Sequence, residues 1–357
     1  MKKSVSLLVM GYAMLLGILW MGLADSALSA ETVTLNGGGA SFPLPLYLKW
    51  FRDYNRATPH VIVTYNGIGS GAGIYSFINK RFDFAGSDVP MTTEEAAKVA
   101  DGVVQVPLAA GALVLIYNLE GVDNLRLSRQ AYTGIFLGTV KNWQDPLIAK
   151  ENKGVELPDK EIFLVTRADS SGTSQIMSQH LSAVSETFAK TVGASKEPVW
   201  PSTIAKEGRL VRALANGGVA QMVKVLPGSI GYVEFSYAYF SNIKMVTLQN
   251  KAGRFVAPTT HSFAEALDSA LPSLLEAPVP HLPPDPSGEG SYPILSLTWL
   301  ISNRTYDDPS KVQTLKDVLN YCLTEGPKIN HKLGYLPLPE PLVSKARMQV
   351  GTIELKK

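Results

Sequence analysis

The sequence of 357 residues predicts an α/β protein in which helices pack on largely parallel sheets. Short apolar runs rich in β-branched residues alternate with segments of helical periodicity over most of the chain, which is typical of connected parallel strands. Three of these runs end in turns rich in glycine and hydroxyl residues, directly before a helix-like segment. The sequence has no internal repeat, and its length suits two domains.

The first predicted helix follows the strand-like run VTLNGG and covers about residues 43–56. Its aromatic side chains recur at i, i+3, i+4 and i+7, so they share one face. These are Tyr47, Trp50, Phe51 and Tyr54. The run HVIVTYNG precedes a second predicted helix at about 71–80, and FDFAGSD is expected to be a short strand that ends in a turn.

Further strands are predicted at ALVLIYNL, at EIFLVTRA and at GSIGYVEFSYA. A helix is expected after residue 173. The apolar run that contains ALVLIYNL is too short to span a bilayer, so it is interpreted as core. Residues 278–293 are rich in proline and glycine and are expected to form a surface loop.

The first 30 residues have the layout of a cleaved secretory signal peptide. Lys2 and Lys3 precede a long apolar stretch, and small residues follow up to Ala30. A retained membrane anchor is the alternative, and the polar segment behind the small residues favours cleavage. We therefore expect an exported, soluble mature protein.

Charge and composition exclude several classes of function. The chain has 33 basic and 31 acidic residues, which gives no indication of a nucleic-acid or anionic membrane partner. Cys322 is the only cysteine, so no internal disulfide can form. The five histidines are scattered without metal-ligand spacing, and we expect neither a metal site nor another cofactor.

The three glycine-rich turns are similar helix starts that are suited to bind an anion. They read GGGASFP, GIGSGAG and SSGTS, and place Ser41, Ser70 and Ser171 where helices begin. Backbone N–H groups at a helix start lack partners within the helix and lie at its positive end. Ordinary capping explains each turn taken alone. Together, at the carboxyl ends of parallel strands, they predict an anion site.

Two charged residues occupy matching places at strand ends. Arg167 precedes the third turn and offers a fixed fork of donors to an oxyanion, although a surface ion pair is its simpler interpretation. Asp88 ends the short strand FDFAGSD, and turn capping before Pro90 would also explain it. A carboxylate beside a bound anion is favourable only if the ligand donates a proton to it. Phosphate at neutral pH carries such a proton and sulfate does not.

Two enzyme hypotheses compete with anion binding. The segment from Gly67 to Ala72 fits G-x-G-x-x-A after a strand, with Asp88 about 20 residues on, which is the dinucleotide-binding fingerprint. An exported protein rarely meets such cofactors, and the other two turns would stay unexplained. The serines around Ser171 do not fit G-x-S-x-G and lack an evident base, which leaves an acyl-transfer or phosphatase function weakly supported.

The sequence resembles the family of periplasmic phosphate-binding proteins of ABC transporters. The resemblance rests on GGGASFPLPLYLKW, YNGIGSGAG, FDFAGSDVP, RADSSGTS and LPGSIGYVEFSYA, in that order, and covers nearly the whole mature chain. It implies that phosphate binds at the following residues: Ala40, Ser41, Phe42, Ser70, Asp88, Arg167, Ser171, Gly172 and Thr173. Asp169 matches a residue that pairs with the arginine.

The resemblance also implies the two-lobe periplasmic binding protein fold of type II, with a hinge crossed twice and the ligand cleft between the lobes. We place lobe one at 31–107 plus 258–357 and lobe two at 108–257. The implied protein is a monomer in the periplasm that delivers phosphate to permease subunits and is not an enzyme. Binding of sulfate or molybdate is the alternative. Residues 200–227 depart from the family pattern, so no site residue is assigned there.

Overall fold

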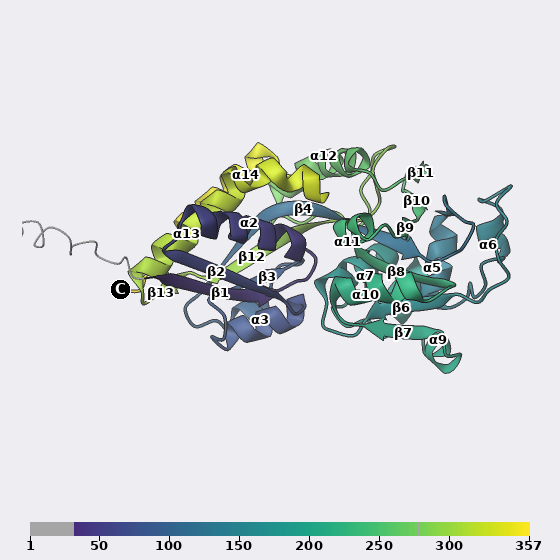
Figure 1. Cartoon of the computed structure of the whole chain (residues 1–357), viewed down its shortest axis with the longest axis horizontal. Coiled ribbons are helices and arrows are strands. Elements are labelled where there is room, and N and C mark those ends of the chain that lie inside the picture. Colours follow the sequence, from purple (N-terminus) through teal and green to yellow (C-terminus); the bar gives the residue numbers. More distant parts are fainter. Residues whose placement is uncertain (1–31, 278) are drawn as a thin grey trace, which may run out of the picture.

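The structure is a computed structural model that describes residues 32–277 and 279–357. The predicted signal peptide, 1–30, lies outside the described residues. Within the described part, nine strands form one long mixed sheet, in the order β2-β1-β3-β12-β4-β8-β6-β7 with β9 beside β4. Figure 1 shows two lobes side by side along this sheet. We call the lobe with β1, β2 and β3 the first lobe, and the lobe with β6, β7 and β8 the second lobe.

The first lobe has a parallel core of three strands covered by helices on both faces (Figure 1). Its first elements are β1 (Val33–Gly39), α2 (Leu44–Ala57), β2 (Val61–Gly67), α3 (Ser70–Ile78), β3 (Phe84–Ser87) and α4 (Thr93–Ala96). The predicted aromatic face of α2 is buried, and Trp50 Nε1 donates to the Gly326 carbonyl at 2.8 Å. Both predicted helices of this lobe are confirmed, with bounds shifted by one or two residues.

The C-terminal part of the chain completes the first lobe. Its elements are α12 (Thr260–Glu276), β12 (Leu295–Asn303), β13 (Thr305–Tyr306), α13 (Pro309–Thr324), η1 (Gly326–Leu333), α14 (Glu340–Gly351) and β14 (Glu354–Leu355). Strand β12 inserts antiparallel between β3 and β4. Cys322 is fully buried on α13, and burial raises the pKa of its thiol.

Strand β4 (Val103–Tyr117) is 15 residues long and runs from one lobe into the other. Its first part, 103–112, pairs with β12, and its last part, 113–117, pairs with β8. Twelve successive positions from 106 to 117 are buried, which confirms that this apolar run is core. The same backbone element therefore belongs to the sheets of both lobes.

The second lobe repeats the plan of a parallel core with flanking helices. Its elements are β5 (Arg126–Leu127), α5 (Arg129–Leu137), α6 (Pro146–Ala149), β6 (Phe163–Arg167), α7 (Gly172–Val184), α8 (Glu186–Thr191), α9 (Ser202–Lys206), β7 (Leu210–Ala213), α10 (Ala215–Val225), β8 (Ser229–Glu234), α11 (Phe235–Phe240), β9 (Lys244–Met245), β10 (Thr247–Gln249) and β11 (Phe255–Val256). Strand β6 pairs parallel with β7 and β8, while β8 pairs antiparallel with β4.

One local expectation was wrong in part, and another needs a qualification. The run GSIGYVEFSYA is a strand only to Glu234, whose side chain accepts a hydrogen bond from Ser236 N and so begins the helix α11. The described residues 279–293 do form a loop without helix or strand, but this loop is only partly exposed. Its Asp285 forms an ion pair with Arg129 at 2.7 Å, and Tyr292 is fully buried.

Candidate functional site

The end of β1 brings Ala40, Ser41 and Phe42 to the face of the second lobe, and all three are buried. Ala40 N donates to the Gly86 carbonyl at 2.8 Å, which holds this turn against the end of β3. Tyr335 Oη donates to the Phe42 carbonyl at 2.6 Å. The backbone of the first predicted turn is thus held from both sides, and the Ser41 hydroxyl points toward the second lobe, where its partner lies.

The second turn leads from β2 into α3, which begins at Ser70. Gly69 has φ +94°, a conformation that favours glycine, and a side chain there would collide with Asp169 of the second lobe. Ser70 is fully buried, and its Oγ accepts from the backbone N–H of Asp88 at 3.4 Å. The ends of β2 and β3 therefore lie together, as the sequence predicted.

Asp88 lies at the end of β3 and is almost fully buried. Its Oδ2 accepts from Thr173 Oγ1 at 3.4 Å, whereas Oδ1 has no hydrogen-bond partner among the described residues. Burial raises the pKa of Asp88 to about 7, against the lowering effect of the Arg167 charge. A buried carboxyl with a free oxygen is suited to accept a hydrogen bond from a ligand.

Arg167 ends β6, and its side chain is 1% exposed. Its Nε donates to Asp169 Oδ1 at 2.8 Å, and its Nη2 donates to Asp169 Oδ2. Burial acts to raise the pKa of Asp169, but the hydrogen bonds from Arg167 hold it below its usual value. Arg167 Nη1 also donates to Thr173 Oγ1 at 3.2 Å. The geometry agrees with the expectation that Asp169 pairs with Arg167.

The third turn contains Ser171, Gly172 and Thr173, at the start of α7. Ser171 is the N-cap, and its Oγ accepts from Ser174 N at 3.1 Å. The N–H groups of Gly172 and Thr173 occupy the first turn, where no partner exists within the helix. Gly172 packs directly against Ser70 and Asp88 of the first lobe. These N–H groups and hydroxyls therefore converge on the same small space.

The two lobes touch at this site. Gly71 N, in α3, donates to the Ser170 carbonyl at 3.0 Å, and Lys196 pairs with Glu95 at 2.6 Å. Direct contacts join the predicted site residues Ser70, Asp88, Arg167, Gly172 and Thr173, and Asp169 is bonded to Arg167. The other four, Ala40, Ser41, Phe42 and Ser171, lie in the turns that flank these residues. The resulting cage holds many donors, one arginine and one free carboxyl oxygen. Such a set can bind a tetrahedral oxyanion that carries a proton.

One residue that the sequence analysis missed also lies in this cage. Asn216, at the start of α10, is fully buried and donates to both Ser41 and Thr173. It belongs to the segment 200–227, in which no site residue was assigned. A usable signal was present, because the residues after β7 form a fourth strand-to-helix turn rich in small residues, including Asn216, Gly217 and Gly218.

A buried carboxyl group lies behind the cage on β8. Glu234 Oε2 is hydrogen-bonded to Tyr335 Oη at 2.9 Å and accepts from Ser236 N at 3.0 Å. Burial raises the pKa of Glu234 to about 8, in spite of the hydrogen bonds from Ser236. Because Tyr335 also holds the Phe42 carbonyl, this carboxyl supports the first turn through one intermediate side chain.

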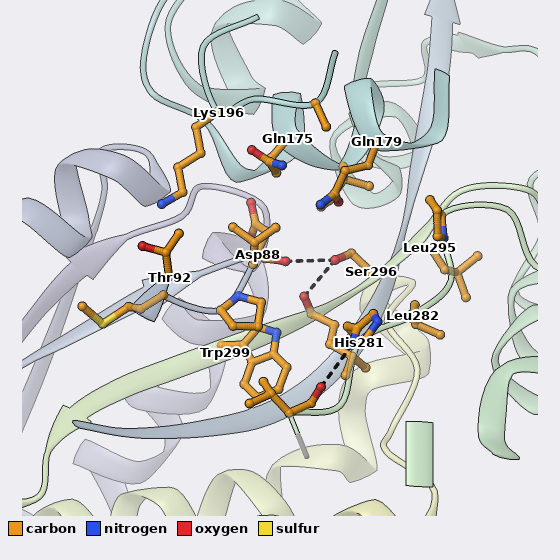
Figure 2. A pocket seen from close by; sticks show the side chains of 18 of the residues that line it. Asp88, Thr92, Gln175, Gln179, Lys196, His281, Leu282, Leu295, Ser296 and Trp299 are labelled. Carbon is orange, nitrogen blue, oxygen red and sulfur yellow. Dashed lines mark hydrogen bonds between the residues drawn. The ribbon is translucent and has the colours of Figure 1, made fainter. Parts of the chain in front are cut away.

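A cavity of about 740 Å³ lies beside the cage, between the lobes (Figure 2). Its lining includes Gln175 and Gln179 of α7, Leu295 and Trp299 of β12, and His281. Among the predicted site residues only Asp88 borders it, and Ser296 Oγ donates to the Asp88 carbonyl at 3.0 Å (Figure 2). The cage and this cavity are therefore neighbouring spaces that meet at Asp88.

The described residues contain no cluster of three or more histidine, cysteine, aspartate or glutamate side chains that would hold a metal ion. Among the helices in the described part of the chain, none has the length and apolar character needed to cross a membrane.

Comparisons with known proteins agree on one family. Residues 25–325 match the model described as PBP superfamily domain. The "Phosphate-binding protein PstS" of Pasteurella multocida is 36% identical over 343 residues, which cover 95% of each chain. The protein of the same name from Haemophilus influenzae is 34% identical, over 92% of this chain and 95% of the relative.

Solved structures show the same fold. A phosphate-bound periplasmic phosphate-binding protein (PfluDING) superposes with a TM-score of 0.70 at 21% identity, over 88% of this chain and 93% of that one. This likeness confirms the predicted two-lobe fold of periplasmic binding proteins. The chain therefore belongs to the PBP superfamily and, within it, to the family of PstS phosphate-binding proteins.

Proposed function

We propose that this protein binds inorganic phosphate in the cage between its lobes and delivers it to the permease subunits of an ABC transporter. The observation that carries the proposal is the buried Asp88, whose Oδ1 has no protein partner in the described residues, inside a cage otherwise made of donors. The names of the relatives support the same ligand. The proposed ligand contacts are the nine residues named above, and Asp169 aims Arg167.

Asp88 favours phosphate over other oxyanions. A phosphate O–H donates to the carboxylate, whereas sulfate and molybdate have no proton at neutral pH and bring only repulsion. Leaving a buried charged acceptor unpaired costs more than the 1–3 kcal/mol of a neutral group. A site built for a ligand O–H can reject an analogue that lacks it by on the order of 10⁴-fold.

We propose that the lobes divide at 31–107 plus 258–357 and at 108–257, and that the chain crosses between them twice. The first crossing lies within β4, whose pairing supports a crossing in this strand but changes from β12 to β8 only after residue 112. Closure of the lobes by a hinge motion would bury the ligand. The closed protein would then present a surface formed by both lobes to the permease.

We further propose that the protein is a monomer, that the predicted signal peptide directs its export to the periplasm, and that this peptide is then cleaved off. Delivery to a membrane permease requires that the protein diffuse to it with its ligand enclosed. The periplasmic setting also agrees with a site that uses no nucleotide cofactor.

An extracellular phosphatase that uses Ser171 is the rival function. A serine nucleophile needs a general base within hydrogen-bond reach. Among the described contacts, Ser171 Oγ accepts from Ser174 N, and the buried His180 is bonded instead to Tyr132 and to the Pro284 carbonyl. This arrangement caps a helix and leaves the serine without activation.

The proposal is tested by calorimetric titration of purified, ligand-stripped protein with phosphate and, separately, with sulfate. We expect tight phosphate binding and sulfate binding weaker by several orders of magnitude. Equal affinity for both anions would overturn the assignment. Hydrolysis of a chromogenic phosphate ester that disappears in Ser171→Ala would instead establish the rival function.

A further inference from the structure

Asn216 makes hydrogen bonds to one site hydroxyl from each lobe. Its backbone N and its Nδ2 donate to Ser41 Oγ at 3.1 and 3.0 Å. Nδ2 also donates to Thr173 Oγ1 at 3.2 Å. The backbone N–H of Glu234 donates to Asn216 Oδ1 at 2.8 Å, and this bond fixes which end of the amide faces the two hydroxyls.

These bonds determine what the Ser41 hydroxyl can do. A hydroxyl oxygen has two acceptor positions and one hydrogen. Both acceptor positions of Ser41 Oγ are taken by N–H groups of Asn216. Its hydrogen is then the only group left to interact with a ligand, so Ser41 can act toward that ligand only as a donor.

The acceptor positions of the Thr173 hydroxyl are likewise both taken, in this case by two different neighbours. Its Oγ1 accepts from Arg167 Nη1 and from Asn216 Nδ2, both at 3.2 Å. The hydrogen of Thr173 therefore points away from both, toward Asp88 Oδ2 and the interior of the cage. Toward a ligand Thr173 can therefore act only as a donor, and to do so it must exchange its 3.4 Å contact with Asp88 Oδ2 for one with the ligand.

We propose that Asn216 is a positioning residue for ligand selectivity, which turns the Ser41 and Thr173 hydroxyls into obligatory donors and links the two lobes through them. The inference rests on the proposed binding of phosphate. It adds that Asn216, without contacting the anion, sets the direction of the hydrogen bonds that Ser41 and Thr173 make to it. Asn216 belongs to the segment 200–227, so this segment contributes to the cage although no site residue was predicted in it.

Asn216→Asp tests the direction of these bonds with little change of shape. The substitution replaces the donor Nδ2 with an oxygen, so that both hydroxyls turn their hydrogens to it and away from the ligand. At pH 8 we expect the Kd for phosphate to rise about 100-fold, the worth of one or two hydrogen bonds to a charged group. At pH 5 a protonated carboxyl donates again, and the loss should shrink to about tenfold or less.

The charged and titratable groups around the introduced carboxyl are Arg167, Asp169, Asp88, Glu234 and Tyr237. Each variant is therefore compared with the wild type at the same pH. The titration of these groups and of phosphate then affects both proteins alike and cancels in the ratio of their Kd values. Asn250→Asp is the matched control. Asn250 is also fully buried, and its Nδ2 lies within hydrogen-bond distance of three backbone carbonyls outside the cage, so its substitution should not change phosphate affinity.

A double-mutant cycle separates positioning from a general structural role. We expect Asn216→Ala to weaken phosphate binding about tenfold or more in the wild type, but less than threefold when Ser41→Ala and Thr173→Val are already present. Equal effects in both backgrounds, or an Asn216→Asp loss that is the same at pH 5 and pH 8, would overturn the inference. If the wild type itself fails to bind phosphate, the proposed function is at fault instead.

Discussion

Gly172→Ala should weaken phosphate binding because its new methyl group would stand between the lobes. Gly172 is the first residue of α7, and an added Cβ would lie 2.8 Å from both Cβ and Oδ2 of Asp88, and closer still to Ser70 Oγ. Both neighbours belong to the first lobe. Alanine suits a helix better than glycine, so the substitution does not disfavour α7 itself.

The size of the effect follows from the contact distance. Carbon atoms in good contact lie about 3.5–4.0 Å apart, so the lobes must separate by roughly 1 Å to admit the methyl group. Overpacking of this kind costs about 1–3 kcal/mol. Because the clash exists only when the lobes are together, the cost should fall on binding. The Kd for phosphate should therefore rise about 5- to 150-fold.

The assay is calorimetric titration with phosphate, together with the melting temperature of the ligand-free protein. Gly217→Ala is the matched control, since Gly217 also lies in the first turn of a helix, and its Cβ would meet only Tyr237 at an ordinary 3.7 Å. We expect this control to bind as the wild type does. A Gly172→Ala protein that binds within twofold of the wild type would show that the binding state is not this closed arrangement.

Two further predictions concern the buried carboxyl groups. Asp88→Asn should lower phosphate affinity, because an amide oxygen accepts more weakly from the ligand O–H, and should raise sulfate affinity, because the amide no longer repels the anion. Competitive calorimetry with both anions checks this, and an unchanged preference for phosphate would contradict it. Glu234→Gln should flatten the pH dependence of stability. Burial raises the pKa of Glu234 from 4.5 to about 8, so the folded state holds this proton more tightly than the unfolded state does. The wild type should therefore lose stability as pH rises from about 4.5 to 8, by at most roughly 5 kcal/mol from this group. Urea unfolding at pH 5 and pH 9 measures both proteins, and parallel curves would refute the role of this carboxyl.

The elements that carry the site were predictable because local sequence determines them. The aromatic spacing of α2 and the glycine and serine residues at the starts of α3 and α7 are short-range signals, and all three helices are confirmed. The convergence of these turns follows from the general geometry of parallel strands. Ser70, Asp88 and Gly172 do lie together as that geometry requires.

The remaining features depend on contacts between distant parts of the chain. Asp285 is held by Arg129, 156 residues away, and no local composition distinguishes such a loop from an exposed one. Asn216 was missed because its importance lies in two partners, Ser41 and Thr173, that come near it only in the folded chain. Helix α11 was read as strand because its aromatic residues also favour strands, and the capping by Glu234 prevailed.

Strand β4 has a consequence for how the molecule comes apart. Its two ends pair with strands of different lobes, and no loop separates them. If one lobe unfolds, the end of β4 that it holds loses its partners, and the strand that continues into the other lobe is destabilised as well. Most of the buried hydrophobic side chains of both lobes also belong to one continuous cluster, which includes those of β4. Heating should thus melt the protein in a single cooperative transition, and amide protons along β4 should be among the slowest to exchange with solvent.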